Sequence, residues 1–253
     1  MIELLLVACA SALAGFVDAV VGGGGLILLP ALFALFPGTP PTTLLGTNKA
    51  AAIWGTAWAS LQYARRVRLH WHTLAPAVVC ALLGGLAGAW AVTQVDARQF
   101  ERALPLVLAA VLAYTLVRKD LGRHHAPRLS ARAEALAGSA IAAVIGFYDG
   151  FFGPGTGSFF VFLFVRLLGH DFLHASAHAK LLNTATNASA LALFASKGMV
   201  WWEIALVAAL ANVVGATLGA RLAIRRGAGF VRGVFVVVVG ALIIKTAYDA
   251  FIR

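Results

Sequence analysis

The stretch GFVDAVVGGGG at residues 15–25 returns at residues 146–157 as GFYDGFFGPGTG. Each copy places an aspartate, Asp18 or Asp149, four residues before the first glycine of a cluster inside an apolar segment. Glycine clusters break helices, and broken backbone inside a membrane survives only where protein covers it or where it lines a wet cavity. The repeated stretch therefore predicts two broken or re-entrant helices that share one small polar site.

The composition around these stretches is that of a membrane protein. Of 253 residues, 61% are apolar and 12% are charged, whereas soluble domains have about 45–50% and about 25%. Apolar runs such as 74–92, 103–117 and 230–247 approach the length that crosses a bilayer. We predict an all-α integral membrane protein with about 8–10 membrane segments, occupying residues 1–253 as a single transmembrane domain.

An internal duplication runs through the chain. The difference in residue number between Asp18 and Asp149 also separates Lys49 from Lys180, without a gap, and we call this constant difference the repeat offset. We predict one repeat over residues 1–120 and a second over residues 133–253, an organisation that is typical of two-half transporters.

The distribution of basic residues predicts that the two repeats are inverted. Lys and Arg accumulate in cytoplasmic loops of membrane proteins. In the first half they follow the segment that ends near residue 64, and in the second half they follow the next segment instead; these groups are Arg65, Arg66 and Arg68, then Arg221, Arg225, Arg226 and Arg232. The net charge of +10 is thus explained by membrane orientation, and no nucleic-acid partner is expected.

Short apolar runs follow both glycine clusters. Residues 26–36 and 158–168 are eleven residues each, which at about 1.5 Å per residue cannot span the hydrocarbon core. A helix that restarts there points its free N–H groups and its positive dipole end at the cavity, which favours an anion. Close helix packing is the alternative role for glycines, and we prefer it for Gly84, Gly88, Gly215 and Gly219.

Polar residues on the next segments complete the predicted site. Asn183 and Asn187 follow Lys180 at helical spacing, so the three share one face, although a lysine can also snorkel and an asparagine can join helices. We expect Asp18 and Asp149 to pair with lysines, to fix the loop or to carry a coupling proton. The predicted substrate-binding residues are Gly22, Gly23, Gly24, Gly25, Asn48, Lys49, Gly153, Gly155, Thr156, Gly157, Lys180, Asn183 and Asn187.

Other chemistries find less support in the sequence. His170, His174 and His178 have a spacing that suits a metal, but the first half has no counterpart, and we expect an interfacial loop there and no metal or other cofactor. No phosphate-binding loop is present, so a gradient of protons or another cation is the expected energy source. An anion channel, a membrane sensor and, less favoured, an intramembrane enzyme using Ser158 remain as alternatives.

The two stretches, together with GTNK at residues 46–49 and AHAKLLN at 177–183, resemble the signature regions of the TauE/SafE family of sulfite exporters, closest to its YfcA-like branch. The resemblance covers essentially the whole chain. It implies a multi-pass transporter of the bacterial inner membrane that moves sulfite, sulfonates, other organosulfur compounds or small carboxylates, and it is compatible with a homo-oligomer. Ala179 stands where the first half has Asn48, so a symmetric cavity is not implied.

Overall fold

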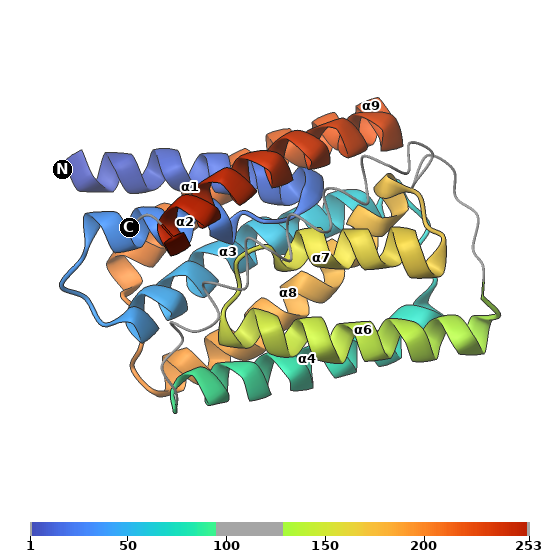
Figure 1. Cartoon of the computed structure of the whole chain (residues 1–253), viewed down its shortest axis with the longest axis horizontal. Helices are drawn as coiled ribbons and strands as arrows, with labels where there is room; N and C mark the ends of the chain where they lie inside the picture. The colour runs from blue at the N-terminus through green and yellow to red at the C-terminus, as the bar shows by residue number, and fades with distance from the viewer. Residues whose placement is uncertain (1, 95–128, 252–253) are drawn as a thin grey trace.

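The protein is helical throughout the part that the structure describes. The computed structural model describes residues 2–94 and 129–251, which form α-helices and one short π-helix without any strand (Figure 1). Three of these helices are long and apolar enough to cross a membrane, at Ile2–Val21, Trp71–Val92 and Trp202–Val238. The predicted all-α membrane protein is confirmed, while the predicted segment at 103–117 lies outside the described residues.

The described helices follow the repeat offset. The first set is α1 (Ile2–Val21), α2 (Gly25–Leu35), α3 (Pro41–Ala64) and α4 (Trp71–Val92). The second set is α6 (Ala131–Phe151), α7 (Thr156–Leu163) with the π-helix η1 (Phe164–Leu168), α8 (Phe172–Ser196) and α9 (Trp202–Phe251). The first residues of α7, α8 and α9 are separated from those of α2, α3 and α4 by the same offset that relates Asp18 to Asp149.

Both glycine clusters form the sharp turns of helical hairpins. In Figure 1, α2 doubles back along α1, and α7 doubles back along α6 toward the opposite end of the molecule. The turns require glycine because Gly22, Gly23, Gly153 and Gly155 have φ values of 82°, 100°, 91° and 85°. We call residues 22–24 and 152–155 the two hairpin tips.

The first hairpin tip touches the start of α7 in the second hairpin, backbone to backbone. A Cβ atom added to Gly22 would lie 2.2 Å from the carbonyl carbon of Gly157, in the first turn of α7. The Ser158 hydroxyl donates a hydrogen bond to the Gly22 carbonyl at 3.1 Å. The absence of side chains at these two glycines therefore lets the two hairpins meet inside the bundle.

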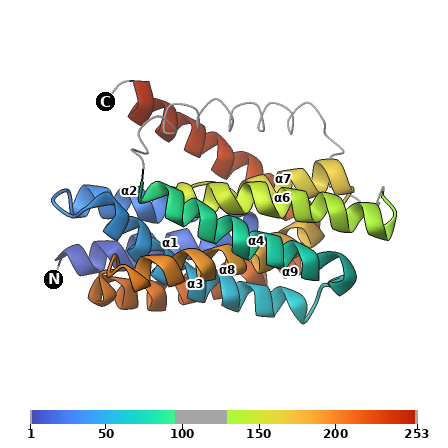
Figure 2. The ribbon, with the colours of Figure 1, turned by 90° about the horizontal axis from the view of Figure 1, so that it is seen from below.

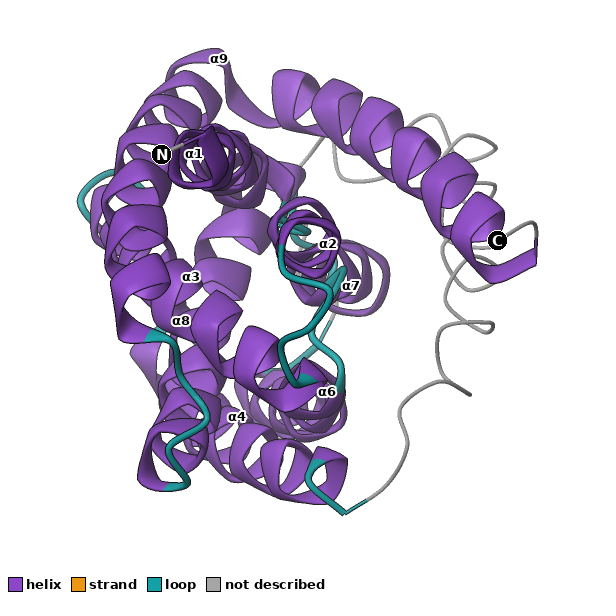
Figure 3. Ribbon diagram, turned by 90° about the vertical axis from the view of Figure 1, so that its left-hand side faces the viewer, coloured by secondary structure: helices purple, strands orange, loops and turns teal. Residues whose placement is uncertain are grey.

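Small residues also join the long helices in two equivalent pairs, α1 with α9 and α4 with α6. A Cβ atom on Gly84 would lie 2.5 Å from the Ala143 carbonyl oxygen, and one on Gly215 would lie 1.8 Å from that of Ala12. The repeat offset relates Gly84 to Gly215 and Ala12 to Ala143, so the two contacts are equivalent. Figure 3 shows the pairs on either side of α3 and α8, which lie between them.

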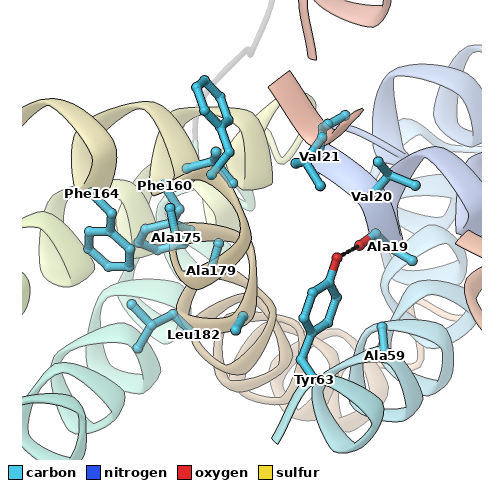
Figure 4. Close-up of a cluster of buried hydrophobic side chains, with 14 of the residues drawn as sticks. Ala19, Val20, Val21, Ala59, Tyr63, Phe160, Phe164, Ala175, Ala179 and Leu182 are labelled. Atoms are coloured by element: carbon cyan, nitrogen blue, oxygen red, sulfur yellow. Dashed lines mark hydrogen bonds between the residues drawn. The ribbon is translucent and has the colours of Figure 1, made fainter. Parts of the chain in front are cut away.

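Side-chain contacts hold the inner ends of the helices. The hydroxyl of the buried Tyr63, at the end of α3, donates a hydrogen bond to the Ala19 carbonyl at 2.9 Å, just before the first tip (Figure 4). Beyond Gly227, where φ is 75°, α9 changes direction (Figure 2). The buried Phe235 in this last part packs on Phe172 at the start of α8, with ring centroids 5.4 Å apart.

Candidate functional site

Two buried ion pairs cross between the two sets of helices. Lys49 Nζ of α3 lies 2.7 Å from Asp149 Oδ1 of α6, and Lys180 Nζ of α8 lies 3.0 Å from Asp18 Oδ2 of α1. The exposed fractions of the side chains are 3% and 2% in the first pair and 0% and 12% in the second. The repeat offset converts one pair into the other, so each lysine is neutralised by the aspartate of the opposite set.

The two aspartates differ in their remaining contacts. Asp18 uses both oxygens, since Oδ2 contacts Lys180 and Oδ1 accepts a long hydrogen bond from the Gly24 amide at 3.4 Å. Asp149 concentrates its partners on Oδ1, which also accepts a hydrogen bond from the Thr156 hydroxyl at 2.7 Å. Its Oδ2 is buried and has no hydrogen-bond partner. Asp149 therefore has one carboxylate oxygen available for a proton or a donor.

A small polar cavity lies between the hairpin tips and the middle of α3, α8 and α9. Its volume of about 30 Å³ exceeds the space that one water molecule needs and is far below that of drug-sized ligand sites. It is lined by Asp18, Gly23, Gly24, Gly25, Leu28, Asn48, Lys49, Ala52, Asp149, Gly153, Thr156, Gly157, Asn183, Asn187 and Asn212.

Most of the residues predicted to bind the substrate meet at this cavity, together with both aspartates. Gly22, Gly155 and Lys180 do not line it. Gly22 instead contacts the opposite hairpin, Gly155 supplies the left-handed turn before α7, and Lys180 contacts the lining residue Asp18. The structure thus separates residues that face the cavity from residues that build its walls.

The first turns of both short helices open on the cavity. Gly25 is the first residue of α2 and Thr156 is the first residue of α7, and both are lining residues. The N-terminus of a helix carries partial positive charge. Two such ends therefore add to the attraction of the site for negative charge.

One polar lining residue, Asn212, is not among those predicted from the sequence. Asn212 lies in α9, is buried and donates from Nδ2 to the Ser11 carbonyl at 3.1 Å. Its counterpart in the first repeat is Ala81, so the duplication gave no indication of a role. The usable signal was an isolated amide within a long apolar run, since polar groups at that depth are expensive and mark functional positions.

The three histidines lie away from the cavity and form contacts of their own. The predicted interfacial loop is wrong for His174 and His178, because the Asp171 carboxylate caps α8 by accepting from the His174 amide at 2.8 Å. His170 Nε2 lies 3.1 Å from Glu134 Oε1, and its Nδ1 lies 3.1 Å from His178 Nδ1. Within residues 2–94 and 129–251, no three His, Cys, Asp or Glu side chains are grouped as metal ligands.

Known proteins are similar to this chain over nearly its whole length. The family model described as sulfite exporter TauE/SafE matches residues 7–246. The "Probable membrane transporter protein" of Haemophilus influenzae is 36% identical over 247 residues, covering 97% of this chain and 95% of the relative. The "Probable membrane transporter protein ORF9" of a Sinorhizobium species is 37% identical over 240 residues, covering 95% and 90%.

A third relative, the "Probable membrane transporter protein YfcA" of Escherichia coli K12, is 36% identical over 239 residues, which cover 94% of this chain and 87% of the relative. No solved structure matches the chain. Because the family model and these relatives span nearly all of it, the chain belongs to the sulfite exporter TauE/SafE family.

Proposed function

We propose that this protein is a secondary transporter that carries a small anion together with a proton through the site between the hairpin tips. The names of the family and of the relatives support membrane transport. Transport of an anion together with a proton is supported by the pair of crossed, buried lysine–aspartate contacts at a polar cavity. Sulfite, sulfonates and small carboxylates are the substrate class that fits these donors.

The balance of charge at the site supports coupling to a proton. Two lysines and two aspartates sum to zero, so an anion that enters alone leaves one uncompensated buried charge. An uncompensated charge in a poorly solvated site costs several kcal/mol of free energy. A proton that arrives with the anion removes this penalty, because it neutralises one aspartate and releases a lysine as the ligand of the anion.

Asp149 is the better candidate for that proton. Its Oδ2 is buried without a partner, whereas both oxygens of Asp18 already have donors. Protonation of Asp149 weakens its attraction for Lys49, which lines the cavity and lies beside Asn48 in α3. Lys49, the amide donors and the two helix N-termini then form a positively charged pocket for an oxyanion.

The proposed carrier is one transmembrane domain of two repeats that are inverted in the membrane. In Figure 1, α1 runs from left to right and its counterpart α6 runs from right to left. Arg65 and Arg66, after α3, line the same pocket as Arg221 and Arg225 in α9, so basic residues from different points of the two repeats lie on one side. Both observations support inversion, a multi-pass position in the bacterial inner membrane, and rocking of the halves around the site.

Proteoliposomes with an imposed proton gradient test this function. Sulfite, thiosulfate, methanesulfonate and acetate are offered outside, and their accumulation is measured with and without the gradient. For a substrate of the wild type, we expect Asp149→Asn to abolish gradient-driven accumulation while exchange of the anion across the membrane continues. Asp18→Asn makes the same chemical change in the other pair and should retain coupling, and Glu203→Gln, at an exposed position, is the control for the loss of a carboxylate.

Four results would contradict the proposal. Accumulation that never exceeds equilibrium indicates a channel. If none of the four anions crosses the membrane, the proposed substrate class is wrong. If proton coupling is equal in the wild type and in Asp149→Asn, the proton is carried by another residue. Loss of binding as well as coupling in Asp149→Asn would make the carboxylate a structural element of the pocket.

A further inference from the structure

A groove runs along the outside of the bundle between α3 and α9. The two helices run in the same direction: Gly46 contacts Met199 near their starts, and Gly55 contacts Asn212 farther along. At the far end, Arg65 at the end of α3 and Arg221 of α9 line one pocket. The groove is separate from the polar cavity, whose lining residues lie on the inner faces of these helices.

The first part of the groove is apolar and wide. It has a volume of about 330 Å³, with Ala50 and Trp54 on one wall and Leu206 and Leu210 on the other. Trp54, Leu206 and Leu210 have exposed fractions of 62%, 65% and 66%. In a membrane, a hollow of this kind is filled by hydrocarbon, so its chemistry suits an acyl chain.

The second part of the groove is strongly basic. It has a volume of about 510 Å³ and is lined by Arg65, Arg66, Arg221 and Arg225, with Trp58, Gln62 and Ile224. Within the described ranges none of these four guanidinium groups forms a salt bridge. Gln62 adds a buried Nε2 group without an acceptor. Guanidinium and amide donors are suited to phosphate oxygens.

The two parts follow one another along the same two helices, α3 and α9. Trp54 lines the apolar part and Trp58 the basic part, and the two residues are one helical turn apart on the same face of α3. From Arg65 back to Ala50 the helix rises by about 22 Å at 1.5 Å per residue. That length is about half of a bilayer 40–45 Å thick with its headgroups, so the groove matches one leaflet.

We propose that this groove binds one anionic phospholipid, with the phosphate among the four arginines and an acyl chain along the apolar part. The polarity along the groove, its length and its position at the basic end of the bundle all fit such a molecule. Anionic lipids of the inner leaflet are attracted to basic residues at this depth. The proposal stands apart from the transport chemistry, since none of these residues lines the polar cavity.

Charge also argues against a second copy of the chain in the groove. The arginines would need acidic residues opposite them, but in the part of the chain described here the exposed carboxylates Glu3 and Glu203 belong to different helices. The other carboxylates whose surroundings the structure describes already contact lysine or histidine side chains; these are Asp18, Asp149, Glu134 and Asp171. A free phosphate ion, in turn, would use the basic part alone and leave the apolar part without a role.

Lipid titration of the purified, full-length protein tests this proposal. Native mass spectrometry counts bound lipid as phosphatidylglycerol or phosphatidylcholine with identical acyl chains is added. We expect one tightly held phosphatidylglycerol and weaker binding of phosphatidylcholine. The double variant Arg65→Gln/Arg221→Gln should lower the affinity for phosphatidylglycerol by about 25-fold, at about fivefold per arginine.

Two further variants separate the headgroup from the chain. Arg68→Gln/Arg226→Gln removes the same charge from exposed positions outside the groove and should change the affinity less than threefold. Trp54→Ala should lower the affinity for both lipids by the same factor and preserve the preference for phosphatidylglycerol. All substitutions are at exposed positions, so thermal unfolding without added lipid should match the wild type.

The proposal is overturned by any of four results. The first is equal binding of the two lipids, and the second is an equal effect of the two arginine double variants. The third is that inorganic phosphate protects the protein against thermal unfolding as well as phosphatidylglycerol does. The fourth is a dimer that forms without lipid and dissociates in Arg65→Gln/Arg221→Gln, because that result assigns the groove to a second copy of the chain.

Discussion

Removal of one lysine from a crossed ion pair tests whether the two buried charges depend on each other for the stability of the fold. In Lys49→Met the side-chain volume is retained, but Asp149, only 2% exposed, loses its cation. Breaking a buried pair from one side costs about 3–5 kcal/mol, since it leaves a charge without compensation. The Thr156 hydroxyl still donates to the carboxylate at 2.7 Å, so we expect a loss near the lower end, about 3 kcal/mol.

The loss should be visible as a change in melting temperature. For a chain of this size about 2–4 °C corresponds to each kcal/mol, so Lys49→Met should melt about 6–12 °C lower than the wild type in the same detergent. The double variant Lys49→Met/Asp149→Asn has no buried charge at this pair and should recover most of the difference. Lys197→Met changes an exposed lysine and should stay within about 2 °C, because exposed charges contribute little.

Additivity is the result that refutes this reasoning. If the double variant melts as low as the sum of the two single variants predicts, the lysine and the carboxylate do not depend on each other. The same conclusion follows if Lys49→Met melts like the wild type, because a buried carboxylate would then need no partner.

Three further substitutions test the tips and the cavity. Gly22→Ala should prevent the hairpins from meeting and reduce the yield of folded protein in fluorescence-detected gel filtration, whereas Gly138→Ala, with no atom near its added Cβ, should not. Thr156→Val deletes a hydrogen bond to the charged carboxylate of Asp149 and should lower the free energy of unfolding by about 1.5–3 kcal/mol, which is visible as a lower melting temperature. Asn48→Ala removes a buried oxygen without a partner, so it should retain or raise the melting temperature while it weakens anion transport.

Each of these expectations has a clear contrary result. Equal yields for the two glycine variants mean that the tips tolerate separation. An unchanged melting temperature in Thr156→Val means that the hydroxyl does not support the carboxylate. Transport that survives Asn48→Ala places the anion away from this amide.

Much of the architecture follows from local properties that the sequence carries directly. The repeat offset indicated in advance which helices correspond, and the glycine clusters marked the turns because only glycine adopts such positive φ values without strain. The same pattern brought Asp18, Lys49 and Asp149 to the list of site residues. Their residue types were informative because charge inside a membrane segment is expensive.

The pairing of these residues depended on the path of the chain in space. A sequence shows that two lysines and two aspartates occupy equivalent places, but it allows pairs within a repeat as well as pairs between repeats. The crossed arrangement arises because α1 packs on α9 and α6 packs on α4, which exchanges partners between the two sets of helices. The long-range contact that brings Asn212 of α9 to the cavity was hidden for the same reason.

The cavity departs from the symmetry of the duplication where its polar groups are concerned. Asn48, Thr156 and Asn212 line it, while their counterparts in the other repeat are Ala179, Gly25 and Ala81. In the proposed carrier an anion would therefore meet different donors from the two repeats, and of the two aspartates only Asp149 has an oxygen without a partner. Because the two repeats differ in this way, the inward-facing and outward-facing states of the proposed carrier need not have equal energies, and the proposed protonation of Asp149 would favour one of them.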